Sequence, residues 1–140
     1  MNTIPRSHAV QATTERTIRE TLAASNAGRI HFGQVVATLV EAGVESYAID
    51  YRACRATYYL PDGDTLAVEQ PPPEAPIGDA FDTAAVIAAI RGAQAGRVMY
   101  PEFKRLTQAA GCIGYTVWLA GRHVSYFGRR GEVHIEHFPS

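Results

Sequence analysis

The stretch DTAAVIAAIRGAQAGRVMYPEFKRLTQAAGCIGYTVWLAGRHVSYFGRRGEVHIEH, residues 82–137, decides the fold because it repeats an earlier part of the same chain. Placing Asp82 on Thr14 and keeping that offset aligns residues 14–69 with residues 82–137 without a gap. Eight of the 56 aligned positions are identical, which is about twice what average composition produces by chance. The sequence therefore predicts a tandem duplication with repeats 14–69 and 82–137.

The positions that match are those that end helices and alternate along strands. Both first helical segments stop at Ala-Gly-Arg, residues 27–29 and 95–97, and both second segments stop at Ala-Gly, a common helix C-terminus. Beyond Gly111 the apolar period changes from helical to two residues, which is typical of strands. Each repeat thus reads helix, helix, three-stranded antiparallel meander. We predict one α+β domain over residues 1–140, with helices packed on one face of the sheets.

Composition and charge narrow the class of protein. Apolar residues make up 46% of the 140 residues and charged residues 19%, as in ordinary globular domains. A net charge of −1 gives no field that draws the chain to nucleic acid or anionic lipid, and no apolar run is long enough to span a membrane. Met1–Ala12 lacks the apolar core of a signal peptide, and two cysteines are too few for a disulfide framework. We expect a cytoplasmic protein, and we expect the proline-rich segment 70–81 to be a stiff connector.

The turn sequences predict which side chains share a face of the second sheet. If the turns at residues 120–121 and 128–131 are tight hairpins, Tyr126 pairs with Val133 and Val124 with Ile135. The opposite, solvent-facing side then holds a mostly polar set: Thr116, Trp118, His123, Ser125, Phe127, Glu132, His134 and Glu136. Where the second repeat has His134 and Glu136, the first has Leu66 and Val68. This divergence places the candidate functional site on the outer face of the second repeat.

Several C-terminal motifs resemble the YdfO-like family of bacterial, prophage-associated proteins. The motifs are Tyr100-Pro101-Glu102-Phe103, Ala110-Gly111-Cys112, Gly114-Tyr115, Gly121-Arg122, Tyr126-Phe127-Gly128-Arg129 and Glu132-x-His134-x-Glu136-x-Phe138-Pro139, with Tyr58–Gly63 upstream. The resemblance covers residues 30–139 and implies a small α+β fold. It implies no activity, cofactor or catalytic residue, so the site has to be argued from the residues themselves.

One hypothesis for the site is a metal centre. His134 and Glu136 lie two residues apart on one predicted strand, and the predicted register puts His123 across from Glu136. Two imidazoles and a carboxylate can hold zinc or iron with an open position. A second catalytic reading makes Ser125 a nucleophile opposite His134, although no strained turn presents that serine. Both readings depend on the predicted register.

The main hypothesis is a binding module without catalysis or cofactor. Trp118 and Phe127 supply apolar anchors on the outer face, and Arg122 and Arg129 lie at the hairpin tips beside His123, His134 and Glu136. The partner classes left open are another protein, a second copy of the chain and a small anionic ligand, whereas the net charge argues against nucleic acid. The alternative is a metal-binding protein or metal-dependent enzyme centred on His123, His134 and Glu136.

Overall fold

The computed structural model describes residues 10–139, so most of Met1–Ala12 lies outside the described residues. Helices α1 (Ala12–Asn26) and α2 (Phe32–Glu41) precede strands β1 (Ser46–Asp50), β2 (Arg55–Tyr59) and β3 (Thr65–Glu69). Helices α3 (Thr83–Gln94) and α4 (Tyr100–Ala109) then precede β4 (Cys112–Trp118), β5 (His123–Gly128) and β6 (Val133–His137). The predicted α+β fold and its duplicated order are confirmed.

Backbone geometry repeats with the offset found in the sequence. Helix α4 occupies the positions equivalent to those of α2, and β6 occupies the positions equivalent to those of β3. The described residues with a positive φ also form equivalent pairs: Gly28 and Gly96, Gly43 and Gly111, Cys54 and Arg122, Gly63 and Gly131. Because positive φ marks helix ends and tight turns, the chain changes direction at the same points in both repeats.

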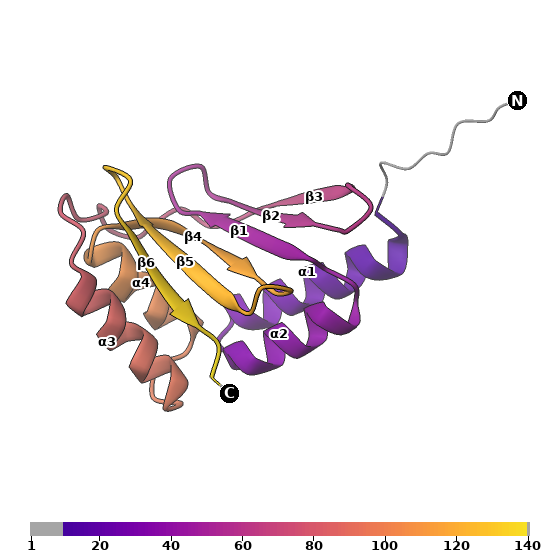
Figure 1. Ribbon diagram of the computed structural model, residues 1–140, viewed down its shortest axis with the longest axis horizontal. Coiled ribbons are helices and arrows are strands. Elements are labelled where there is room, and N and C mark those ends of the chain that lie inside the picture. The colour runs from indigo at the N-terminus through magenta and orange to yellow at the C-terminus, as the bar shows by residue number, and fades with distance from the viewer. Residues whose placement is uncertain (1–9, 140) are drawn as a thin grey trace, which may run out of the picture.

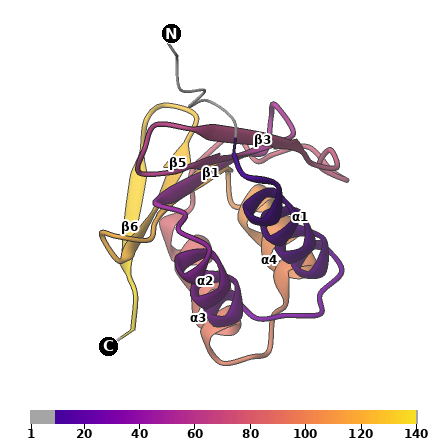
Figure 2. The ribbon, with the colours of Figure 1, turned by 90° about the vertical axis from the view of Figure 1, so that its right-hand side faces the viewer.

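The two repeats share one antiparallel sheet of six strands in the order β3-β2-β1-β4-β5-β6. Strands β1 and β4 join the repeats, and Ala48 pairs with Thr116 at the middle of this ladder. These two residues are equivalent in the duplication, so a pseudo-two-fold axis passes between them. All four helices cover the same side of the sheet (Figures 1 and 2).

Local sequence signals explain the second pair of helices. The Asp82 carboxylate accepts a hydrogen bond from the Ala85 N–H at 3.1 Å and so caps α3. Pro101 occupies the first turn of α4, where it has no helical hydrogen bond to lose. Within residues 10–139, no helix has the length and apolarity to cross a bilayer.

Side chains from the inner sheet face and from all four helices form the core. Its fully buried members include Ile18, Leu39, Tyr58, Val86, Val117 and Cys112. Outside the helices and strands, residues 70–81 connect the repeats, and β5–β6 loop residues hold the connector in place. Arg129 donates to the carbonyl oxygens of Ile77 and Gly78, at 3.1 and 3.4 Å.

The predicted register of the last hairpin is wrong by one residue. Tyr126 pairs with His134 and Val124 with Glu136, whereas Val133 pairs with Phe127. Since side chains alternate between faces, this shift moves His134 and Glu136 to the helix-facing side and Val133 and Ile135 to the solvent side. The same holds in the first repeat, where Leu66 pairs with Tyr58 on the inner face.

Candidate ligand-binding cavity

A cavity of about 520 Å³ lies between the helix layer and the sheet. All four helices and five of the six strands contribute to its wall, which is mainly aliphatic and aromatic. Many wall positions are equivalent pairs in the duplication, among them Leu22 and Ile90, Ile30 and Val98, Phe32 and Tyr100, Val35 and Phe103, Tyr47 and Tyr115, Tyr58 and Tyr126. The cavity therefore lies on the pseudo-two-fold axis and is built by both repeats.

Five tyrosines give this wall its character: Tyr47, Tyr58, Tyr100, Tyr115 and Tyr126. The rings of Tyr47 and Tyr58 stack with centroids 5.2 Å apart, and those of Tyr115 and Tyr126 lie 5.6 Å apart. The Tyr115 hydroxyl donates to the Tyr100 hydroxyl at 3.0 Å. Among residues 10–139, no hydrogen-bond partner is found for the hydroxyls of Tyr47, Tyr58 and Tyr126.

Burial fixes the protonation state of these phenols. Desolvation raises the pKa of Tyr100 to about 12 and raises that of Tyr47, Tyr58, Tyr115 and Tyr126 as well. All five phenols are consequently neutral at physiological pH. Each hydroxyl can donate one hydrogen bond and accept others, and buried polar groups normally have such partners.

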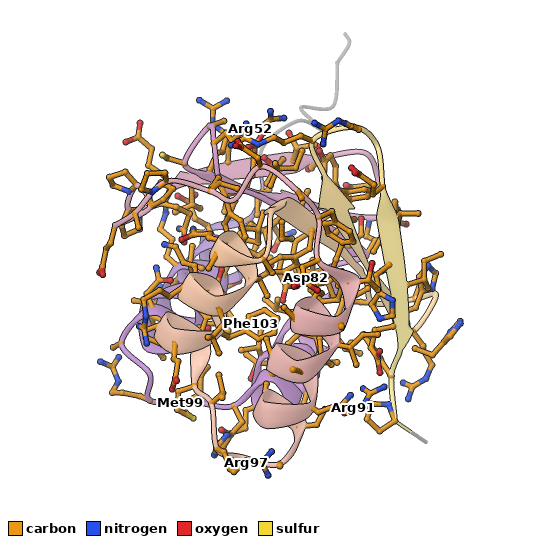
Figure 3. The ribbon with its side chains drawn as sticks, turned by 90° about the vertical axis from the view of Figure 1, so that its left-hand side faces the viewer. Arg52, Asp82, Arg91, Arg97, Met99 and Phe103 are labelled. Carbon is orange, nitrogen blue, oxygen red and sulfur yellow. The ribbon has the colours of Figure 1, made fainter. Side chains whose placement is uncertain are left out.

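Glu136 supplies a charged group to the cavity wall. Its Oε2 accepts from Arg91 Nη1 at 2.7 Å and from Gln94 Nε2 at 3.4 Å, while Oε1 lies 3.2 Å from Nε2 of His134. Arg91 extends from the side of α3 that faces β6 (Figure 3). Desolvation raises the pKa of Glu136, but the hydrogen bonds from Arg91 and His134 and the Arg91 charge outweigh it, so the pKa lies below its usual value.

The corrected register separates the three residues of the metal hypothesis. His134 and Glu136 lie on the inner face, where the His134 ring stacks on Tyr126 with centroids 6.3 Å apart. His123 pairs with His137 instead, and their rings lie 5.7 Å apart. Within residues 10–139 no group of three or more His, Cys, Asp and Glu side chains is arranged to hold a metal ion.

The catalytic reading of Ser125 also relied on the wrong register. Ser125 pairs with Ile135, not with His134. Its hydroxyl accepts a hydrogen bond from Trp118 Nε1 at 3.1 Å. Ser125 therefore faces away from His134, and among residues 10–139 its hydroxyl has no hydrogen bond to a base that could activate it.

The other predicted binding residues do not form one site with His134 and Glu136. They are Trp118, Arg122, His123, Phe127 and Arg129. Trp118 and His123 lie side by side with ring centroids 6.2 Å apart, and Phe127 pairs with Val133 at the other end of the ladder. Arg122 stacks over the Phe138 ring at 5.4 Å, and Arg129 binds the connector. We call the exposed side chains Trp118, Val133 and Ile135 the outer patch; they are 40%, 51% and 47% exposed.

Sequence reasoning assigned the tyrosines to a core and did not predict the cavity. A signal was nevertheless present in the duplication. Tyr47 and Tyr115, and Tyr58 and Tyr126, are two of the eight identical pairs. Aliphatic side chains fill a core as well as tyrosine does without a hydroxyl to satisfy, so tyrosine kept at paired inner positions indicates a use for its hydroxyl.

Fold and site together define a duplicated α+β protein with a tyrosine-walled cavity between its helices and its sheet. Residues 5–70 match a family described as a protein of unknown function (DUF1398). Uncharacterised proteins of Mycobacterium bovis and of two Mycobacterium tuberculosis strains are 37% identical over 59 residues, which are 42% of this chain. The chain matches only 36% of the length of each of these relatives. The similarity is thus to proteins of unknown function, and it gives no support to the YdfO-like or prophage assignment.

Proposed function

We propose that this protein binds a small, largely apolar molecule in the cavity between its helices and its sheet. The unpartnered hydroxyls of Tyr47, Tyr58 and Tyr126 in a mainly aliphatic and aromatic wall carry the proposal. A volume of about 520 Å³ lies within the range of roughly 300–1,000 Å³ typical of small-molecule sites. An apolar ligand gains from burial, and its polar atoms would pair with the hydroxyls.

Both repeats have to be present for this site to exist. The sheet is continuous only because β1 pairs with β4, and the paired tyrosines come from either side of that junction. The proposal therefore keeps small-ligand binding from the sequence hypothesis and moves it from the outer face to the interior. Any prophage association of the chain stays a hypothesis based on its C-terminal motifs.

The test uses a neutral fluorescent probe, 2-(1-naphthyl)ethanol, titrated into the whole chain. Its 13 non-hydrogen atoms at about 0.5 kcal/mol each give a Kd of roughly 10–100 µM. Ala93 lines the cavity, whereas Ala88 on the same helix is exposed. Ala93→Trp fills the cavity and should weaken binding at least tenfold, and Ala88→Trp is the matched control. Circular dichroism tests whether both variants are folded.

Absence of probe binding to the wild-type chain would refute the proposal. Equal binding by wild type and a folded Ala93→Trp variant would refute it too, because the probe would then bind elsewhere. Native mass spectrometry of the protein as isolated adds a direct search for a retained molecule. A mass increment that Ala93→Trp removes and Ala88→Trp keeps would show a retained molecule bound in the cavity.

A second candidate function is protein binding through the outer patch, which the sequence hypothesis placed on this face. Three apolar side chains that are 40–51% exposed and share one sheet face favour it, since protein interfaces bury apolar and aromatic side chains. Sedimentation equilibrium tests a second copy of the chain as the partner. We expect self-association that Trp118→Ala weakens; a monomer at all concentrations would exclude the second copy.

A further inference from the structure

The cavity wall carries a negative charge and, in the part of the chain that the structure describes, no permanent positive charge. Of the side chains that line it, Glu136 is the one that carries a full charge, and no lysine or arginine of residues 10–139 lines it. Two histidines contribute to the lining: His31 directly precedes α2, and the His137 ring contacts His123 on the outer face. A ligand inside the cavity therefore meets a carboxylate and aromatic faces, and no permanent cation.

We propose that the preferred ligand is an amphipathic molecule with a protonated amine. Glu136 binds the amine, and tyrosine rings enclose the apolar part. This proposal rests on the proposed binding function of the cavity. The faces of aromatic rings attract cations, and five tyrosines are available here. The unpartnered tyrosine hydroxyls offer further acceptors for the N–H groups of an ammonium. A carboxylate ligand would instead face Glu136 with no permanent countercharge in the wall.

Arg91 makes the binding of a cation feasible. This side chain neutralises Glu136 in the ligand-free protein, yet it is 53% exposed, whereas Glu136 is 16% exposed. An arriving ammonium can take the place of Arg91 at Oε2, and the guanidinium can move into water at small cost. His134 remains on Oε1 and keeps the carboxylate oriented. One ion pair is exchanged for another, so the half-buried Glu136 carboxylate is never left without a partner.

The charged carboxylate in the cavity wall occurs in the second repeat and has no charged equivalent in the first. Val68 is the first-repeat equivalent of Glu136, and it does not line the cavity. Leu66 likewise replaces His134, the residue that orients the carboxylate. The wall is thus nearly symmetric in its tyrosines and asymmetric in its charge. A ligand with one charged end and one apolar aromatic end matches such a wall better than a symmetric molecule.

The experiment compares three probes of similar size that differ in their head group: 2-(1-naphthyl)ethylamine, 2-(1-naphthyl)ethanol and 1-naphthylacetate. At neutral pH these are a cation, a neutral molecule and an anion. We expect wild type to bind the amine at least tenfold tighter than the alcohol, and the carboxylate weakest. Glu136→Gln should reduce amine binding to the level of the alcohol and change alcohol binding by less than threefold.

Glu69→Gln is the matched control, because Glu69 is an exposed glutamate at the end of β3 and does not line the cavity. This variant should keep the preference for the amine. Equal binding of amine and alcohol by wild type would overturn the cation inference and leave the cavity proposal intact, whereas no binding of any probe would overturn both. Tightest binding of the carboxylate, abolished by Arg91→Ala, would show an anion site and also overturn the inference.

Discussion

Replacing Gly114 by alanine tests the junction on which the single sheet and its cavity depend. Gly114 lies on β4 opposite Asp50 of β1. A Cβ at this position would overlap the Ile49 carbonyl oxygen and come within 3.3 Å of the Asp50 Cα, both of them backbone atoms. Backbone cannot move aside as a side chain can, so the two strands have to separate locally.

Two contributions determine how much Gly114→Ala lowers the free energy of unfolding. Overfilling a packed site costs about 1–3 kcal/mol. Separation of the strands also threatens the adjacent hydrogen bond from the Tyr51 N–H to the Ile113 carbonyl, 3.0 Å long, with a net value of about 0.5–1.5 kcal/mol. We expect Gly114→Ala to lower the free energy of unfolding by about 2–4 kcal/mol. For a chain of this size that corresponds to a fall in Tm of roughly 6–15 °C.

Urea unfolding followed by circular dichroism and by the fluorescence of Trp118 measures the change. Gly33→Ala is the control, because Gly33 lies in α2 and a Cβ there would meet no atom within 4 Å. That substitution should be neutral or stabilise by up to about 1 kcal/mol through a less flexible unfolded chain. Gly114→Ala with the stability of wild type would show that β1 and β4 are not paired as described, and the shared sheet would have to be abandoned.

Three further predictions concern other contacts. Glu136→Gln should lower the free energy of unfolding by up to about 1 kcal/mol at pH 7, because Arg91 loses its carboxylate partner. The pKa of Glu136 in the folded protein lies below its usual value of 4.5. The stability difference between wild type and variant, measured by urea titration, should therefore be complete above pH 4.5 and become smaller at lower pH. Arg129→Ala should increase hydrogen exchange in residues 70–81 several-fold with global stability little changed, because Arg129 binds two connector carbonyls. With a thiol reagent on the native protein, the half-buried Cys54 should react and Cys112 should not, because burial raises the pKa of the Cys112 thiol to about 11; reaction of both thiols at one rate would contradict the burial of Cys112.

The fold could be predicted from the sequence because its signals are local and occur twice. Helix ends at Gly28 and Gly43 recur at Gly96 and Gly111, and all four have a positive φ in the structure. The β4–β5 register was also correct, with Tyr115 opposite Tyr126. Duplication helped because a weak signal at one site is confirmed by its equivalent in the other repeat.

The last hairpin could not be predicted because its register depends on turn geometry that the sequence leaves open. Gly128 and Gly131 are compatible with more than one loop length. In the structure the Gly128 N–H donates to the Glu132 carbonyl at 2.8 Å, and the ladder starts with Phe127 opposite Val133. The tight-hairpin assumption paired Tyr126 with Val133 instead. A difference of one residue was enough to exchange the inner and outer faces of β6.

The cavity was beyond sequence reasoning for another reason: it depends on how far the helices stand from the sheet. Periodicity assigns a side chain to a face and says nothing about the space in front of it. Here Tyr47 and Tyr115, and Tyr58 and Tyr126, approach from the two repeats. Whether such side chains meet or leave a gap depends on the packing of four helices against a curved sheet.

The divergence between the repeats lies on the inner face of β6, not on the outer face where the predicted register placed it. Polar residues in place of Leu66 and Val68 would leave an unpaired charge if they occurred deep in the core. On β6 they are tolerated because β6 is an edge strand and α3 provides Arg91 as a partner for Glu136. The first repeat has Ala23 at the position of Arg91, so it lacks the matching cation. The charge and its partner therefore occur together, and in the second repeat alone.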